Sequence, residues 1–182
     1  MLIGNPYQLA FLVEVVAYWN QNGVSPFYNG ILLICVDGEM YPKQLNTATL
    51  SVDIPCLESV LTNVAIDEKL FNLDKDTAYK KMHKATFPSW RDIERGVDND
   101  YQYDLSPQSF SDCDCIAFVV SNGEQVRILV AQLYYDREES AYDIENIDIS
   151  EAYVTLSEIK EIVSELKTII DQNGQKRTDN AS

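Results

Sequence analysis

The sequence has few of the residues on which most enzyme sites depend. Its 182 residues include one histidine and seven glycines, and we find no Gly-rich phosphate loop, nucleophile elbow or kinase-type motif. A Ser-His pair, a Cys-His pair or a histidine metal site would have to be built around His83 alone. His83 stands among lysines on a predicted helix, so we expect an exposed histidine without a catalytic role. We therefore predict no catalytic residues, no cofactor and no bound metal.

Long hydrophobic runs and suitably spaced cysteines are also lacking. The longest apolar stretch, residues 9–19, is interrupted by Glu14 and is too short to cross a bilayer. The first residues lack the positively charged region of a secretory signal. Four cysteines are present, but Cys113 and Cys115 lie closer together than zinc ligands usually do. These absences predict a cytoplasmic protein with reduced thiols and no association with membranes.

Positive charge is scarce, and the acidic residues are concentrated in one third of the chain. Against 14 Lys and Arg there are 29 Asp and Glu, giving a net charge of −15. Residues 92–151 hold 15 acids and 3 bases, a net charge of −12, whereas the flanking segments carry −2 and −1. A negative field repels nucleic acid and attracts basic partners, although it can also serve solubility alone. We expect a basic protein partner and no nucleic-acid binding.

The residues that are present predict antiparallel strands joined by tight hairpins. Asp37 and Gly38 follow the apolar run 31–36, and Asn122 and Gly123 lie between two further apolar runs. Both dipeptides are typical of two-residue type I′ turns. Because the run 31–36 is apolar on both of its faces, we expect this strand to be covered on both sides or to lie at the centre of a sheet.

Other elements follow from local patterns. Residues 9–19 favour a strand, with a short buried helix as the alternative, and residues 47–54 alternate in the manner of a further strand. Pro55 is expected in the first turn of a short helix. Asp74 is expected to cap a second helix that runs to about Lys84.

The C-terminal helix has the strongest pattern. Thr155 and Glu158 have the spacing of a capping box, and aliphatic residues recur at three- and four-residue steps over residues 156–170. Such a stripe must be buried, and a sheet is the obvious partner. We expect Gly174 to end this helix.

Together these elements predict a single α+β domain over residues 1–174. It should contain an antiparallel β-sheet of four to six strands, with a long C-terminal helix and one or two shorter helices packed on it. A short edge strand is expected near residues 147–149. Residues 175–182 are polar, so we expect a frayed tail.

Acidic and tyrosine residues in the polar stretch 92–114 and after the second hairpin are the candidate partner-binding residues. Tyrosine supplies rigid contact area, and carboxylates pair with Arg and Lys. The first acidic patch is predicted to comprise Asp98, Asp100, Tyr101, Tyr103, Asp104, Asp112 and Asp114. The second acidic patch is predicted to comprise Asp136, Glu138, Glu139, Asp143 and Glu145.

Other functions remain open for these residues. The aspartates of residues 98–114 could hold a divalent metal in a hydrolase, although the calcium-loop pattern is incomplete. That alternative predicts carboxylates that converge within a few ångström and stabilisation of the protein by metal. The same acidic surface would suit an adaptor or a nucleic-acid mimic. A merely structural protein would instead scatter its charges over all faces.

The first third of the sequence carries short motifs in a particular order. They are Met1-Leu-Ile-Gly-Asn-Pro-Tyr7, Tyr18-Trp-Asn20, Tyr28-Asn-Gly30, Val36-Asp-Gly38, Tyr41-Pro42 and Thr49-Leu50. Over residues 1–55 their order and spacing resemble the immunity protein 42 family of bacterial polymorphic toxin and contact-dependent growth inhibition systems. Asn5 departs from the Gly-Asp-Pro expected there, which puts little in doubt if the residue serves the turn.

The resemblance implies a small cytosolic protein that binds a cognate toxin domain, often a nuclease, and so protects the producing cell. It brings no catalytic residues. We interpret Trp19 as a core residue and Gly30 as a turn position. With the charge pattern, this predicts an inhibitor that covers the active or substrate-binding surface of the toxin with an acidic face.

Overall fold

The strands form two larger antiparallel sheets. The structure, a computed structural model of the whole chain, describes residues 1–20, 27–136 and 141–180. The first sheet has the order β1-β2-β3-β4 and comprises β1 (Leu2–Gly4), β2 (Leu9–Val15), β3 (Gly30–Val36) and β4 (Glu39–Tyr41). The second sheet has the order β5-β6-β9 and comprises β5 (Cys115–Ser121), β6 (Gln125–Gln132) and β9 (Ile149–Thr155). The α+β class is confirmed, with the predicted strands divided between two sheets.

A two-stranded ribbon and several helices complete the chain. The ribbon pairs β7 (Tyr135–Asp136) with β8 (Ala141–Tyr142). The helices are η1 (Ala17–Asn20), α1 (Leu50–Thr62), α2 (Glu68–Phe71), α3 (Lys75–Thr86), α4 (Trp90–Glu94), α5 (Gln108–Ser111) and α6 (Leu156–Asn180). Among the described residues, no helix is both long enough and apolar enough to cross a membrane.

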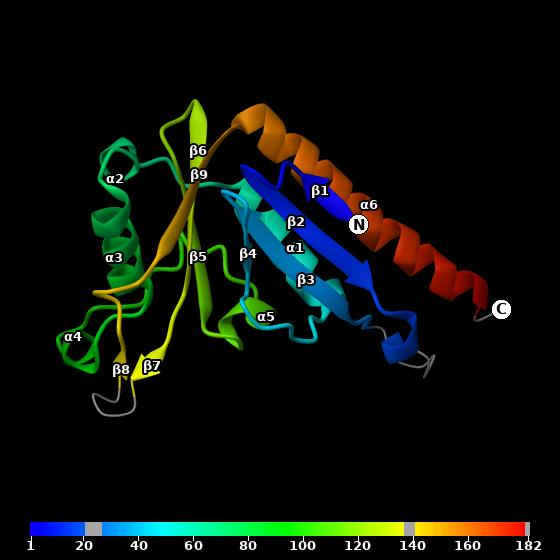
Figure 1. Cartoon of the computed structure of the whole chain (residues 1–182), viewed down its shortest axis with the longest axis horizontal. Coiled ribbons are helices and arrows are strands. Elements are labelled where there is room, and N and C mark those ends of the chain that lie inside the picture. Colours follow the sequence, from blue (N-terminus) through cyan, green and yellow to red (C-terminus); the bar gives the residue numbers. More distant parts are fainter. Residues whose placement is uncertain (21–26, 137–140, 181–182) are drawn as a thin grey trace.

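The second sheet is buried on both faces. One face contributes Ala117, Ile128 and Val154 to a core shared with the first sheet, α1 and α6. Its other face contributes Phe118 and Leu129 to a second core beneath α2 and α3. Figure 1 shows this arrangement, with α2 and α3 on one side of the second sheet and the first sheet on the other. The fold is therefore layered around the second sheet.

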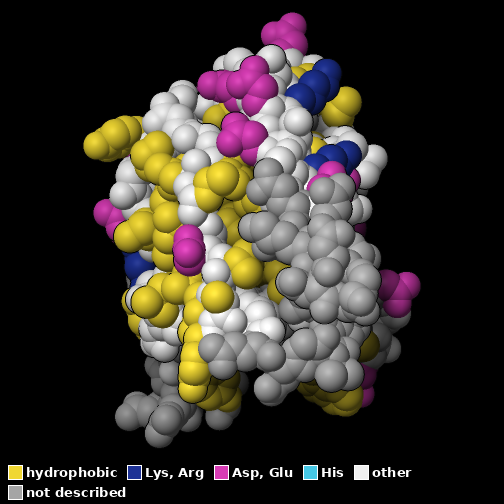
Figure 2. All heavy atoms as spheres, turned by 90° about the vertical axis from the view of Figure 1, so that its right-hand side faces the viewer, with side chains coloured by type: hydrophobic (Ala, Val, Ile, Leu, Met, Phe, Trp, Pro, Cys, Tyr) yellow, Lys and Arg dark blue, Asp and Glu magenta, His cyan; other side chains and the backbone are white. Residues whose placement is uncertain are grey.

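The first sheet is less completely covered. The strand register places Leu2 beside Leu12 and Met40 beside Cys35 on the face that points away from the shared core. Leu2 and Met40 are exposed, whereas Cys35 is buried. Figure 2, which looks onto the right-hand side of Figure 1, shows hydrophobic side chains gathered there with few charged ones among them.

The two predicted hairpins are present, but their turns differ. Asp37 and Gly38 both have positive φ angles, 53° and 81°, as a two-residue type I′ turn requires. Between β5 and β6 only Gly123 does, with φ of 95°. The side chain of Asn122 accepts hydrogen bonds from the amides of Glu124 and Gln125 instead. The predicted type I′ turn is wrong there because this side chain organises a three-residue connection.

Residues 47–54 do not form the predicted strand. Ala48 makes an isolated bridge to Gly30, and α1 begins two residues later. The buried residues of α1 recur at helical steps; they are Leu50, Asp53, Ile54, Leu57 and Leu61. This three- and four-residue period extends well beyond the short alternation, so it decides the structure. Pro55 lies inside the helix rather than in its first turn.

The remaining predictions are largely confirmed. Residues 9–15 form a strand, and the run 31–36 is its central neighbour in the first sheet. Asp74 caps α3 by accepting a hydrogen bond from the amide of Thr77 at 2.9 Å. The stretch 92–114 is ordered and contains two short helices.

The capping box at the start of α6 forms as predicted, but the strand before it and the end of the helix differ from the predictions. The Thr155 amide donates to Glu158 at 2.7 Å, and the Glu158 amide donates to the Thr155 hydroxyl at 3.2 Å. The strand before it spans seven residues because Ala152 and Val154 alternate with partly exposed polar residues. The helix continues to Asn180, so the predicted end at Gly174 is wrong. A helical glycine costs only about 1 kcal/mol, and no proline follows to stop the helix.

Arg127 fastens the connection between α2 and α3 to the second sheet. Its side chain is 1% exposed. It donates to the backbone carbonyls of Phe71 at 2.7 Å and Leu73 at 2.8 Å, and its Nε donates to Glu151 at 2.6 Å. The guanidinium also lies over the ring of Tyr153. The positive charge is thus fully partnered inside the protein.

Candidate functional site

The first part of the first acidic patch lies on the surface beside α3. Asp98 and Tyr101 are exposed. Asp100 is half-buried, and its carboxylate accepts hydrogen bonds from the amide and side chain of Gln102 at 3.1 and 2.6 Å. The amide of Asp100 donates to the carbonyl of Ala85, which holds the segment against the end of α3. These three candidates are positioned where a partner could contact them.

Tyr103 and Asp104 turn towards the protein. The hydroxyl of Tyr103 donates to Asp67 at 3.2 Å, and burial together with this carboxylate raises the pKa of Tyr103 to about 12. Asp104 bridges to Phe118 through its backbone and accepts a hydrogen bond from the amide of Ser106 at 2.8 Å. Burial raises the pKa of Asp104. Both side chains therefore stabilise the segment and present little of their surface to a partner.

Asp112 and Asp114 lie beyond α5 and face different surroundings. Asp112 is exposed and accepts a hydrogen bond from Gln108 at 2.6 Å. Asp114 accepts one from the hydroxyl of Tyr142 at 2.5 Å, which raises the pKa of that tyrosine. Since Tyr142 belongs to β8, Asp114 is joined to the surroundings of the second acidic patch, whereas Asp112 borders a pocket beside α1.

The described part of the second acidic patch lies between β8 and β9. Asp143 accepts hydrogen bonds from Asn146 and from the amide of Glu145, and these lower the pKa of Asp143. Glu145 forms an exposed ion pair with Lys80 of α3 at 2.5 Å. The side chain of Asp136 and the whole of Glu138 and Glu139 lie outside the described residues.

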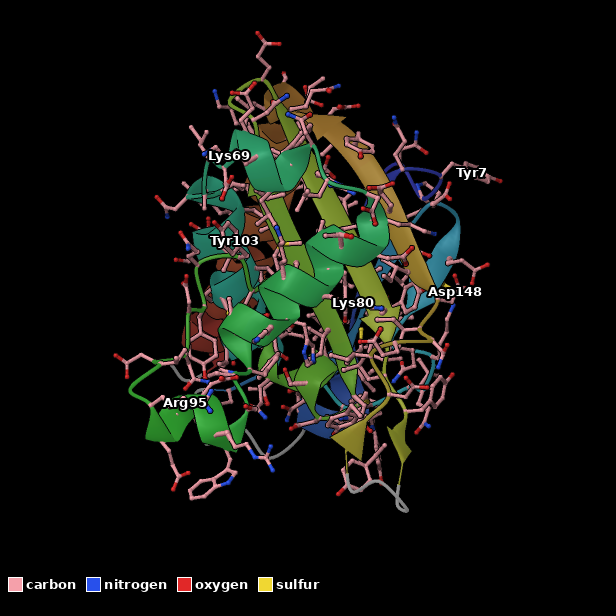
Figure 3. All side chains as sticks on the ribbon, turned by 90° about the vertical axis from the view of Figure 1, so that its left-hand side faces the viewer. Tyr7, Lys69, Lys80, Arg95, Tyr103 and Asp148 are labelled. Carbon is pink, nitrogen blue, oxygen red and sulfur yellow. The ribbon has the colours of Figure 1, made fainter. Side chains whose placement is uncertain are left out.

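Helix α3 separates the two acidic regions. Figure 3 shows Tyr103 on one side of this helix and Asp148 on the other, with Lys80 on the helix between them. Lys81 and Lys84 are exposed on the same helix. The described candidates therefore surround a basic helix instead of gathering into one cluster, and Asp114 is the member that links the two patches.

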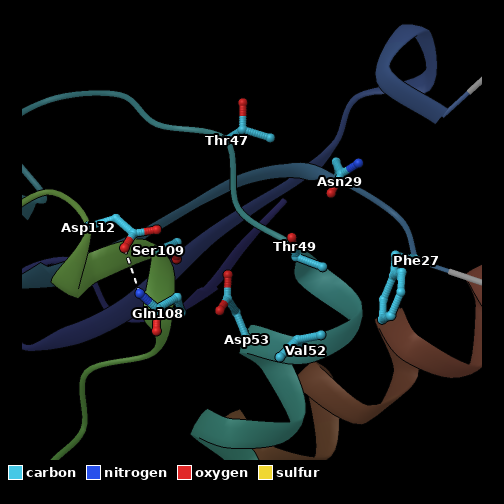
Figure 4. Close-up of a pocket in the computed structure, with 9 residues that line it drawn as sticks. All are labelled: Phe27, Asn29, Thr47, Thr49, Val52, Asp53, Gln108, Ser109 and Asp112. Atoms are coloured by element: carbon cyan, nitrogen blue, oxygen red, sulfur yellow. Dashed lines mark hydrogen bonds between the residues drawn. The ribbon is translucent and has the colours of Figure 1, made fainter.

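A pocket of about 460 Å³ opens between α1 and α5. Figure 4 shows Asp53 and Val52 of α1 on one wall and Ser109 of α5 with Asp112 on the other. Asp53 is 2% exposed. Burial and then the charge of Asp112 raise the pKa of Asp53, while nearby Ser109 and the amide of Thr49 oppose part of that rise. The pocket therefore combines an acidic rim with a buried carboxyl group.

Sequence reasoning missed Asp53 and Ser109. Residues 47–54 were predicted to form a strand, which hid the helical spacing that places Asp53 among Leu50, Ile54 and Leu57. An aspartate within an apolar helical stripe was the available signal, because charged residues are rarely buried without a partner. Nothing in the sequence indicated that Ser109 lies opposite this helix.

The prediction that His83 is exposed is wrong. It is half-buried between the rings of Tyr79 and Phe87, with ring centroids 6.3 and 5.1 Å away. Its helical position places it next to the face that packs on the second sheet, where Tyr79 and Met82 are buried. Burial lowers the pKa of His83, so the neutral imidazole is favoured.

The cysteines are thiols in surroundings that disfavour thiolates. All four are free; Cys35 and Cys115 are buried, whereas Cys56 is exposed on α1. Burial raises the pKa of Cys115 to about 12 and also raises that of Cys113. Within the described residues, no group of three or more His, Cys, Asp or Glu is placed to hold a metal ion. The hydrolase alternative therefore lacks a converging group of three such ligands in that part of the chain.

Two of the recognised motifs form a single structural unit. The side chain of Asn20 donates to the carbonyls of Val16 and Asn29 at 2.7 and 2.8 Å, and its oxygen accepts from the Asn29 amide at 2.7 Å. Trp19 is 42% exposed, so its interpretation as a core residue is wrong. The tryptophan belongs to η1, which follows the strand instead of continuing its buried face.

Gly30 and Asn5 also serve the fold. Gly30 is the first residue of β3, not a turn residue, and a Cβ there would lie 2.1 Å from the Glu14 oxygen and 2.5 Å from Leu50. Glycine is needed because the backbone and α1 approach so closely. The side-chain oxygen of Asn5 accepts a hydrogen bond from the Tyr7 amide at 3.1 Å, a role that aspartate would fill equally well.

The fold and the candidate site together describe an α+β protein that presents acidic and tyrosine side chains on its surface. The sequence motifs of its first third stabilise the scaffold. The sequence matches the model of the immunity protein 42 family over residues 1–169. The chain therefore belongs to the immunity protein 42 family, as the motifs of its first third indicated.

A solved structure confirms the fold. The chain is similar to CdiI from Burkholderia dolosa AUO158, with a TM-score of 0.68 and 22% sequence identity. The similarity covers 94% of this chain and 99% of the other. None of the curated proteins matches the sequence.

Proposed function

We propose that this immunity protein binds a cognate toxin domain and neutralises it by covering its active or substrate-binding surface. It acts as a stoichiometric inhibitor in the cytoplasm and catalyses no reaction. Membership of an immunity-protein family carries this proposal, and the net charge of −12 in residues 92–151 supports a basic toxin. A nuclease domain is the expected type of toxin, because an enzyme that binds phosphates needs a basic surface.

The exposed members of the two acidic patches supply the proposed contacts. Asp98, Tyr101, Asp112 and Asp143 are exposed and lie on different connections around α3 and α5. Carboxylates in such positions speed the encounter with a basic partner, and tyrosine supplies contact area. Tyr103 and Asp104, which make internal hydrogen bonds, hold the exposed residues in place.

The decisive experiment is recovery of the toxin and measurement of its neutralisation. The tagged protein would be used to capture partners from a lysate of its native cells, and any basic domain recovered would be expressed alone and together with the immunity protein. Co-expression should restore growth, and the complex should have one-to-one stoichiometry. If growth arrest persists with a saturating amount of immunity protein, the proposal is wrong.

A charge reversal would test the acidic surface itself. Asp98→Lys should slow association with the toxin by about tenfold at low salt and much less at high salt, because exposed charges act mainly on the association rate. Glu161→Lys on α6 provides a matched control, since it makes the same change at an exposed position outside residues 92–151. Equal slowing by both variants would show that net charge matters but that this surface does not.

A further inference from the structure

The pocket between α1 and α5 contains a buried carboxylate with one oxygen that has no hydrogen-bond partner in the part of the chain that the structure describes. Among the described residues, neither Oδ2 of Asp53 nor the hydroxyl of Ser109 makes a hydrogen bond, although both atoms are buried. The two residues are only 2% and 6% exposed. Buried polar atoms in folded proteins nearly always have partners, so two orphaned atoms in one pocket indicate that something from outside completes their bonding.

The chemistry of the pocket favours a cation. Asp112 places a second carboxylate at the rim, where it already accepts a hydrogen bond from Gln108. Two carboxylates without a cation repel one another, and the inner one also loses hydration. A positive group between them would relieve both effects. A metal ion is the poorer candidate, because the described residues there supply no third acidic, histidine or cysteine ligand.

The shape and lining favour an arginine over a lysine. The acceptors lie on facing walls, with Asp53 on α1 and Asp112 and Ser109 at α5, as Figure 4 shows. A guanidinium offers five donors in a planar fork that can serve several acceptors at once, whereas an ammonium is a point charge. Phe27 and Val52 provide apolar surface for the aliphatic stem. The pocket volume of about 460 Å³ is sufficient for such a side chain.

We propose that this pocket receives an arginine side chain of the toxin domain, with Asp53 as the buried acceptor and Asp112 as the acceptor at the rim. The inference rests on the proposed function, since the toxin supplies the arginine. It identifies a specific anchoring point where the acidic patches describe only a general attraction. Buried, hydrogen-bonded arginines are among the residues that dominate binding at protein interfaces.

A small-molecule probe tests the pocket without any toxin. Methylguanidinium would be titrated into the wild-type protein while the amide signals of Thr49, Asp53 and Ser109 are followed by NMR. Saturable shifts are expected in wild type and in Glu161→Gln, a control that removes one exposed carboxylate on α6, outside the pocket. Asp53→Asn should bind at least about tenfold more weakly, and methylammonium should bind wild type more weakly. Absence of saturable shifts, or equal binding by Asp53→Asn, would overturn the inference.

The toxin complex provides the second test. Asp53→Asn should weaken the complex by about 30-fold or more, as expected when one partner of a buried charge pair is removed. Asp112→Asn should have a smaller effect, and Glu161→Gln, a control at an exposed position on α6, should change the affinity less than about threefold near physiological salt. Loss of one toxin arginine should then cost little further affinity in the Asp53→Asn background.

The two proposals fail in different ways. A toxin that binds wild type and Asp53→Asn equally would refute the arginine pocket while leaving the immunity function intact. If the wild-type protein neutralises no toxin, the proposed function is refuted. The methylguanidinium titration would still decide whether the pocket recognises a guanidinium.

Discussion

Arg127 and Asp53 are the two charged residues buried among those the structure describes, and the fold treats them differently. Arg127 behind the second sheet donates to two backbone carbonyls and to Glu151. Asp53 beneath the pocket has an oxygen that no described residue satisfies. Burying a charge is costly unless it is paired and hydrogen-bonded. One site is therefore complete in the free protein, whereas the other is the one that we propose a partner completes.

The difference separates a region that serves stability from the region that we propose serves binding. Around Arg127 the helices α2 and α3 cover the sheet; Nη1 of the arginine holds the connection between them, and its other nitrogens pair with Glu151 of β9. Around Asp53 the protein keeps an open pocket and a raised carboxyl pKa. Proteins commonly retain such unfavourable arrangements where function requires them. The comparison predicts that substitutions in the two regions change stability in opposite directions.

The largest expected effect comes from removing the partnered charge. Arg127→Met should lower the free energy of unfolding by about 3–5 kcal/mol, because the carbonyls of Phe71 and Leu73 and the carboxylate of Glu151 would lose their donor. Urea denaturation would measure the loss. Lys160→Met, at an exposed position on α6, should change stability by less than about 0.5 kcal/mol. A loss below about 1 kcal/mol for Arg127→Met would contradict the structural role.

A smaller loss is expected where α1 meets the first sheet. Gly30→Ala places a Cβ within 2.5 Å of Leu50 and closer still to a backbone oxygen of β2. The strand and helix must separate, at a cost of about 1–3 kcal/mol. Because α1 forms a wall of the pocket, this variant should lose toxin affinity together with stability. Retention of full stability would show that the close approach does not require glycine.

Removing the unpartnered charge should have the opposite effect. Asp53→Asn is expected to raise the free energy of unfolding of the unbound protein at neutral pH, because a buried, unpaired negative charge is removed. The same change should weaken toxin binding, so stability and affinity would move apart. Thermal unfolding and toxin binding measured on one preparation would check both effects. Destabilisation by Asp53→Asn would indicate that the carboxylate has a structural partner after all.

The advantage of Asp53→Asn should depend on pH. The folded protein raises the pKa of Asp53 above its ordinary value of 3.8, so the folded state holds the proton more tightly than the unfolded state. The contribution of Asp53 to stability is therefore greatest below pH 3.8 and is lost as the pH rises through the raised folded value. The advantage of the variant over wild type should grow over that interval and then level off. A difference that is largest in acid would contradict this sign.

The smallest change in stability is expected on the exposed acidic surface. Asp98→Lys should alter the free energy of unfolding by less than about 0.5 kcal/mol, since the residue is exposed and its role is proposed to be electrostatic. Its effect should appear in the association rate instead. Comparison of urea midpoints and association rates for the same variant would separate the two.

The sequence predicted the elements whose signals are local. The turn at Asp37 and Gly38, the cap at Asp74 and the capping box at Thr155 depend on neighbouring residues, and all three are confirmed. The strand predicted at residues 47–54 was wrong because a period-two pattern in a short window also fits one turn and a half of a helix. Longer periodicity, visible only through Leu61, settles that case.

The candidate site was less accessible to sequence reasoning. Composition identified an acidic segment, but only the fold shows that Tyr103 and Asp104 turn inward while Asp98 stays exposed. The pocket joins Asp53 to Ser109, which lie on helices far apart in the chain. Such a pair depends on tertiary packing, so no local pattern predicts it.

The position of α3 places a strip of positive charge between two acidic regions of the surface. Lysines on that helix lie between acidic side chains on either side of it, as Figure 3 shows for Lys80. A uniformly negative surface attracts a basic partner in any rotation, but a banded one favours rotations that keep the partner's cations away from the lysines. In the proposed complex, this arrangement would exert a torque that aligns the toxin before the two proteins touch.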